Sequence, residues 1–167
     1  RLAVKNVFTT SSVLVRRQVL ERIGVFDPEL RGPEDYDLWL RIAEEHRVAV
    51  QEIPLVGYRT VSGSLGRRAV SMETGLRRIL RKLDDRRAWR GDWLLRRKAR
   101  AYCGYSCAFL YSAAGDQKSA LSRILGSILE YPLPYRSGEV RFLFGRLRML
   151  TMILRRLPGG ARAPRTA

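Results

Sequence analysis

The sequence predicts an α/β fragment followed by an all-helical extension. Segments rich in β-branched residues alternate with helical patterns up to residue 59, whereas from residue 71 onward apolar residues recur at helical spacing. The charge changes at the same place. Residues 1–66 hold nine basic and nine acidic side chains, and residues 67–167 hold the other 23 basic and seven acidic ones. Two units with different roles are therefore expected.

The composition bounds the class of protein. The 167 residues carry a net charge of +16 and are 46% apolar, so a buried core and a polyanionic partner are both expected. Two cysteines are too few for a disulfide framework, and the single histidine, His46, makes a zinc site unconvincing. No apolar run approaches the ~20 residues of a transmembrane helix. Because the chain begins as if in mid-fold, with neither Met nor a signal-peptide pattern, we expect a fragment.

Local signals place the elements of the first unit. Gly24 is a plausible end for a short helix, and Pro33 followed by three acids at the positive end of a helix dipole is a strong start for a longer one. Pro54 breaks a run of β-branched residues into two pieces. We therefore expect strands over residues 7–16, helices over 17–24 and 34–46, and strands over 48–53 and 55–59.

The second unit is expected to be helical throughout. Its breaks fall at Gly91, at residues 115–116 and at residues 132–134. The helical segments are residues 73–83, 93–114, 117–131 and 139–157. The predicted organisation is thus an α/β part over residues 1–66, a basic helical extension over 67–157 and a disordered tail over 158–167.

Four motifs in the first unit occur in a consistent order and spacing. They are Thr10-Ser11-Ser12 before a hydrophobic pair, IGVFDPEL at residues 23–30, PEDYDLWLRI at residues 33–42 and PLVGYR at residues 54–59. Together they make residues 5–66 similar to the second half of family 2 glycosyltransferases, which have the GT-A fold. Each motif is weak by itself, but four in register are specific.

The resemblance implies the acceptor-side, C-terminal portion of an inverting glycosyltransferase. Asp35 would be the catalytic base that takes the proton from the acceptor hydroxyl as it attacks the anomeric carbon. Glu34 would hydrogen-bond the acceptor or orient the loop, and Trp39 would either lie beneath a sugar ring or pack in the core. The whole enzyme would use a nucleotide-sugar donor and a saccharide or lipid-linked acceptor. The nucleotide-binding half is not in this sequence, so the fragment would be inactive by itself.

The resemblance also implies a divalent cation, Mn²⁺ or Mg²⁺, with ligands mostly outside this fragment. Asp35-Tyr36-Asp37 matches a D-x-D metal motif literally, but residues i and i+2 of a helix point about 200° apart, so both carboxylates cannot reach one ion. Many relatives have a histidine where Val61 stands. Arg59 would contact a phosphate or form a salt bridge at the end of a strand.

The extension contains a partial match to a tetratricopeptide helical hairpin. Ala108 and Ala120 are small enough to let two helices approach closely, and Tyr111 and Ile124 would fill the space between them. Gly104 stands at the usual position of a Trp. One hairpin cannot bury its own face, so the flanking helices would have to complete the bundle.

Basic residues occur in several clusters along the extension, and these clusters leave its role open. The last of them, over residues 141–156, is an amphipathic candidate for an anionic membrane surface, although solvated helix faces explain it equally well. We expect a cytoplasmic protein, peripheral on the inner face of the membrane. Two other function classes stay open: a helical protein-interaction module and, less favoured, a nucleic-acid-binding protein. Cys103 and Cys107, one helical turn apart, are expected to be buried thiols.

Overall fold

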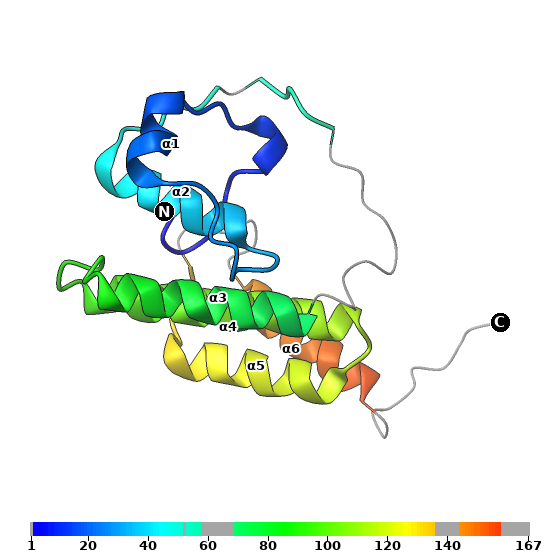
Figure 1. The fold of residues 1–167 in the computed structure, drawn as a ribbon. Helices are drawn as coiled ribbons and strands as arrows, with labels where there is room; N and C mark the ends of the chain where they lie inside the picture. The colour runs from blue at the N-terminus through cyan, green and yellow to red at the C-terminus, as the bar shows by residue number, and fades with distance from the viewer. Residues whose placement is uncertain (1, 52, 58–68, 136–143, 158–167) are drawn as a thin grey trace.

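A computed structural model of the chain describes residues 2–51, 53–57, 69–135 and 144–157. In these ranges the chain forms one 3-10 helix, η1 (Thr10–Ser12), and six α-helices, and it contains no β-strand. The predicted α/β class is therefore wrong, whereas the predicted helical extension agrees with the structure. The N-terminal helices lie above a layer that the later helices form (Figure 1).

The described segments that we expected to be strands have no strand partner. Val13 has an extended backbone, Leu14 is fully exposed, and residues 47–51 are all exposed. β-branched residues favour a strand only when a neighbouring strand pairs with their backbone and covers their side chains. Because no described segment supplies that pairing, residues 10–12 form η1 instead, and the other described residues of the predicted strands have no regular secondary structure. Residues 58 and 59 of the last predicted strand lie outside the described residues.

Two helices organise the N-terminal part, α1 (Arg17–Ile23) and α2 (Glu34–Glu45), and both confirm the predicted helices. Gly24 ends α1 with a φ of 85°, and its N–H donates to the carbonyl oxygen of Leu20 at 2.8 Å. One face of α2 packs against α1 and the preceding residues through buried Leu38, Trp39 and Ile42. The partners on that side are Leu2, Phe8, Val13, Val15, Val19, Leu20 and Ile23.

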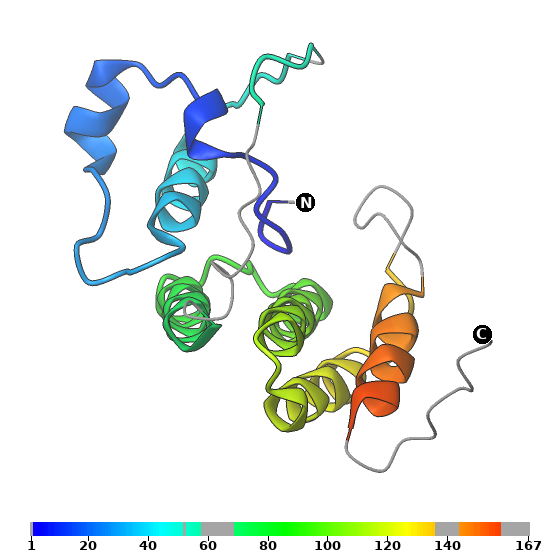
Figure 2. The ribbon, with the colours of Figure 1, turned by 90° about the vertical axis from the view of Figure 1, so that its right-hand side faces the viewer.

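The later helices are α3 (Ala69–Asp85), α4 (Trp93–Ala113), α5 (Gln117–Glu130) and α6 (Gly145–Arg156). They lie in one curved layer in chain order, and the N-terminal part covers the α3 and α4 end of it (Figure 2). Asp92 caps α4 by accepting from the N–H of Leu95 at 2.8 Å. A helix is present in each of the four predicted segments, although α3 begins four residues before its predicted start. The segment predicted over residues 139–157 is helical from Gly145, and residues 139–143 lie outside the described residues.

The α4–α5 hairpin packs as predicted. Ala108, Tyr111, Ala120 and Ile124 are all buried in one cluster, which Ala69 of α3 and Met149 and Ile153 of α6 complete. At Gly104 a Cβ atom would lie 3.3 Å from the carbonyl oxygen of Arg123. The two backbones are thus too close at this point for the Trp that a tetratricopeptide repeat usually carries.

The two predicted units share a hydrophobic core. Leu30, Tyr36 and Leu40 from the N-terminal part form one buried cluster with side chains of the extension. The partners from the extension are Ile79 and Leu83 of α3, Trp89 of the following turn and Ala99 of α4. α2 is therefore buried on two faces, and the layer of later helices fixes its position.

Candidate functional site

Asp35 lies in the first turn of α2, where the backbone N–H groups are not used within the helix. Its two carboxylate oxygens have different partners. Oδ2 accepts from the Thr10 hydroxyl at 2.8 Å, and Oδ1 accepts from the Asn6 side-chain amide at 3.4 Å. Asp35 is only partly buried, so an approaching hydroxyl group can reach it.

The contact between Thr10 and Asp35 joins two of the four sequence motifs. Thr10 belongs to η1, and 25 residues separate it from Asp35. A carboxylate offers about four lone-pair positions, so two remain to accept a proton while two hold its orientation. Asn6 was not among the predicted site residues. Asn6 belongs to no motif or periodic pattern in the sequence, so the sequence gave no reason to place it at the site.

The other predicted binding residues lie in different surroundings. The Glu34 carboxylate accepts from the backbone N–H of Gly32, two residues before it, at 2.6 Å. Trp39 is buried and meets Phe26 edge to face, with 6.5 Å between the ring centroids. Of the two roles considered for Trp39, the structure supports core packing. Arg59 and Val61 lie outside the described residues.

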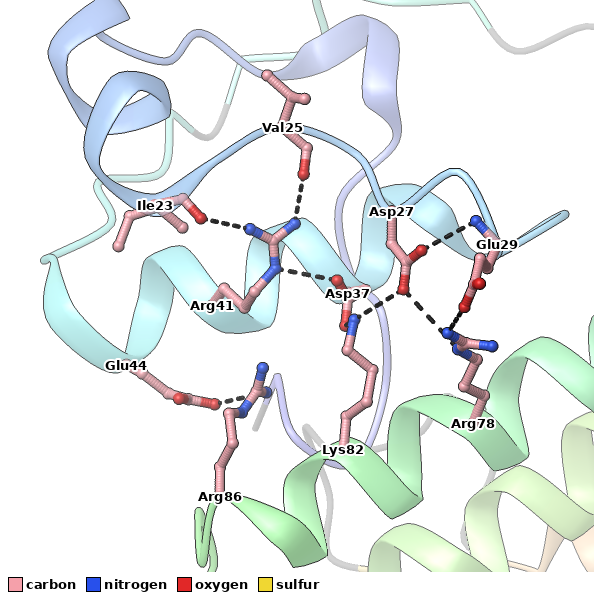
Figure 3. Close-up of polar contacts among 10 residues, drawn as sticks. All are labelled: Ile23, Val25, Asp27, Glu29, Asp37, Arg41, Glu44, Arg78, Lys82 and Arg86. Atoms are coloured by element: carbon pink, nitrogen blue, oxygen red, sulfur yellow. Dashed lines mark hydrogen bonds and ion pairs between the residues drawn. The ribbon is translucent and has the colours of Figure 1, made fainter.

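Asp37, two residues after the candidate base, belongs to a separate charge network (Figure 3). It is fully buried, and its carboxylate pairs with Arg41 Nε at 2.9 Å and with Lys82 Nζ at 2.6 Å. Arg41 also donates to the carbonyl oxygens of Ile23 and Val25, at 2.7 and 2.6 Å, and so ties α2 to the end of α1. Asp35 and Asp37 therefore have no partner in common.

The same network joins the N-terminal part to α3 (Figure 3). Lys82 also contacts Asp27 at 3.1 Å, Arg78 pairs with Glu29, and Arg86 pairs with Glu44 at 3.0 Å. The pKa of Asp27 is lowered, first by the hydrogen bond that its carboxylate accepts from the backbone N–H of Glu29 and then by the contact with Lys82. Asp37 and Arg41 are four residues apart, the spacing of an ion pair within a helix, but the sequence gives no signal for Lys82, which lies 45 residues after Asp37.

A cavity of about 190 Å³ lies behind the candidate base. Asn6 lines it, together with the preceding residues, Tyr36 and parts of α3 and α4. Burial raises the pKa of Tyr36, and it raises that of Tyr102 in the opposite wall to about 12, so both hydroxyl groups stay protonated at neutral pH. The cavity has room for a few water molecules or a small apolar group.

The described residues supply no ligand set for the implied divalent cation. No group of three or more His, Cys, Asp or Glu side chains gathers among them, and Asp37 is already paired with two cations. We therefore assign no step of the reaction to a metal ion.

Comparisons with known proteins add no relative. No family model, no curated protein and no solved structure matches the chain. No described helix is long and apolar enough to cross a lipid bilayer. The resemblance to family 2 glycosyltransferases therefore depends on the four sequence motifs alone.

Proposed function

We propose that this chain is the acceptor-side part of an inverting glycosyltransferase and that Asp35 is its catalytic base. The hydrogen bond between Thr10 and Asp35 is the observation that carries the proposal. Two motifs that are 25 residues apart meet at a partly accessible carboxylate on the first turn of a helix. Core packing does not require that contact, because both side chains are polar and neither is buried.

In the proposed reaction, the acceptor hydroxyl attacks the anomeric carbon of the donor sugar as the bond from that carbon to the nucleoside diphosphate breaks. Asp35 takes the hydroxyl proton, which makes the oxygen a better nucleophile. Thr10 and Asn6 hold the carboxylate in one orientation, so that little reorganisation is needed when the acceptor binds. The donor and a divalent cation would be held by residues outside the described part. We further propose a cytoplasmic location, where nucleotide-sugar donors are available.

The test is Asp35→Asn in the intact enzyme. Asparagine preserves the shape and keeps an acceptor for Thr10, but it cannot take a proton, so transfer should fall by about 10²- to 10⁴-fold with donor affinity unchanged. Asp85→Asn is the matched control, because Asp85 is an exposed aspartate at the end of α3. Transfer by Asp35→Asn at the wild-type rate would refute the assignment.

A further inference from the structure

Large apolar side chains remain exposed on the two last helices of the layer, α5 and α6. Leu125 and Leu129 of α5 are one turn apart and exposed, and so are Leu147 and Leu154 of α6, two turns apart. Leu133 and Phe144, between the helices in sequence, are also exposed. We call these six residues the α5–α6 face. Large apolar side chains exposed on two helices that pack together mark an interaction site more often than an isolated exposed leucine does.

A shallow groove joins the two helices of this face. It has a volume of about 90 Å³ and is lined by Ile128, Pro132, Pro134, Phe144, Arg146 and Leu147. The N-terminal part lies over the opposite end of the layer, above α3 and α4 (Figure 2). The candidate base and the α5–α6 face are thus presented by different parts of the molecule.

The charge around the face is almost entirely positive. Residues 117–130 and 145–156 carry six basic side chains and one acidic side chain, Glu130. Glu130 lies 3.8 Å from Arg97 of α4. Arg155 and Arg156, in the last turn of α6, are exposed and have no ion pair among the described residues. Two arginines without an ion pair among the described residues therefore directly follow Leu154, one of the exposed leucines of α6.

We propose that the α5–α6 face docks on an anionic lipid bilayer, with its leucines at the level of the acyl chains and its arginines against the headgroup phosphates. Leucine and phenylalanine gain from leaving water at the membrane interface, and long arginine side chains reach back to the phosphates. Each basic residue near an anionic leaflet adds to the attraction. This proposal does not depend on the proposed glycosyl transfer.

The other occupants fit the same features less well. A second copy docked through an isologous contact would bring the same arginines together, and like charges oppose such a contact. A nucleic acid would use the arginines, but it would leave the leucines in water, because single strands bind through stacking on aromatic rings. An anionic bilayer satisfies both the charge and the apolar surface.

The experiment measures flotation of the full chain with phosphatidylcholine vesicles that do or do not contain phosphatidylglycerol. We expect retention on the anionic vesicles and little on the neutral ones. The double variant Arg155→Gln, Arg156→Gln should bind the anionic vesicles about thirtyfold more weakly, at about fivefold for each charge. The double variant Leu147→Gln, Leu154→Gln should lose at least about tenfold.

Two control variants remove the same groups from elsewhere on the surface. Arg16→Gln with Arg17→Gln removes two exposed arginines, and Leu14→Gln with Leu55→Gln removes two exposed leucines of the N-terminal part. Both controls should float like the wild type, and circular dichroism should show the same helix content in all variants. Equal losses in the controls and the test variants would overturn the proposal. So would equal binding to neutral vesicles, or a dimer that forms without lipid and is lost in Leu147→Gln, Leu154→Gln.

Discussion

Asp37 is the residue on which the position of the candidate site depends most. Its carboxylate has no exposed surface, and two cations from different elements converge on it, Arg41 from α2 and Lys82 from α3. Buried carboxylates are costly unless such partners are present. Here the partners also join α1, α2 and α3, so the charge network sets how the helix that carries Asp35 lies on the layer below.

Asp37→Asn should destabilise the chain by about 3 kcal/mol, because it leaves Arg41 without its carboxylate partner and leaves Lys82 with Asp27 alone in a partly buried site. Urea unfolding followed by circular dichroism measures this loss. Asp85→Asn, which changes an exposed aspartate, should shift the free energy of unfolding by less than about 0.5 kcal/mol. Equal stability of the two variants would show that the network does not hold the fold together.

At the residue scale, the sequence predicted the site only where local signals exist. Asp35 and Glu34 could be placed on the first turn of a helix because Pro33 and the acids mark its start. The partners of Asp35 and Asp37 could not be predicted in the same way. Asn6 and Lys82 come from distant segments, and single polar residues carry no periodicity that would pair them.

At the element scale, the helices could be predicted and the strands could not. A helix satisfies its backbone within itself, so apolar spacing and a helix end such as Gly24 are sufficient signals. A strand needs a partner, and Val13 has the extended backbone of a strand residue but no strand partner among the described residues. The composition of these segments could not reveal that difference.

The packing between α3 and the start of α2 can be tested at Gly75, because the two helices meet at this residue. A Cβ atom on Gly75 would lie 2.6 Å from both Cγ and Cδ of Pro33, whose ring is rigid. Gly75→Ala should therefore push the first turn of α2 away from α3. We expect a loss of about 1–3 kcal/mol of stability, even though alanine favours the helix, and reduced transfer in the intact enzyme.

The matched control for Gly75→Ala is Gly126→Ala. Gly126 lies inside α5, and nothing is within 4 Å of where its Cβ atom would be. The substitution there should raise stability by up to about 1 kcal/mol, since alanine is the better helix former. Thermal unfolding of both variants gives the comparison, and a stabilising Gly75→Ala would contradict the close packing of α2 on α3.

At the scale of the whole molecule, the structure changes the meaning of the charge difference between the two predicted units. Part of the positive excess of the extension is used internally. Arg78, Lys82 and Arg86 neutralise acids of the N-terminal part, and Arg96 and Arg100 pair with Asp84 at 2.7 Å each. Hydrogen bonds from Arg96 and then Arg100 lower the pKa of Asp84. Arg155 and Arg156, at the end of α6, are exposed and have no ion pair among the described residues.

The shared core makes a final prediction about how the chain folds. Ile79 and Leu83 of α3 are nearly completely buried, and Leu30, Tyr36 and Leu40 help to cover them. Uncovering two such side chains costs about 3–6 kcal/mol, which is comparable to the whole stability of a small domain. The full chain should therefore unfold in one cooperative transition, and a segment of residues 69–157 should be much less stable and bind an apolar dye.

A helical interaction module that folds independently predicts the opposite, namely equal urea midpoints for the segment and the full chain. A second segment, in which Ile79 and Leu83 are both replaced by Gln, tests whether the exposure of these two side chains causes the dye binding. If it does, this variant should bind less dye than the unmodified segment, and its urea midpoint should stay below that of the full chain.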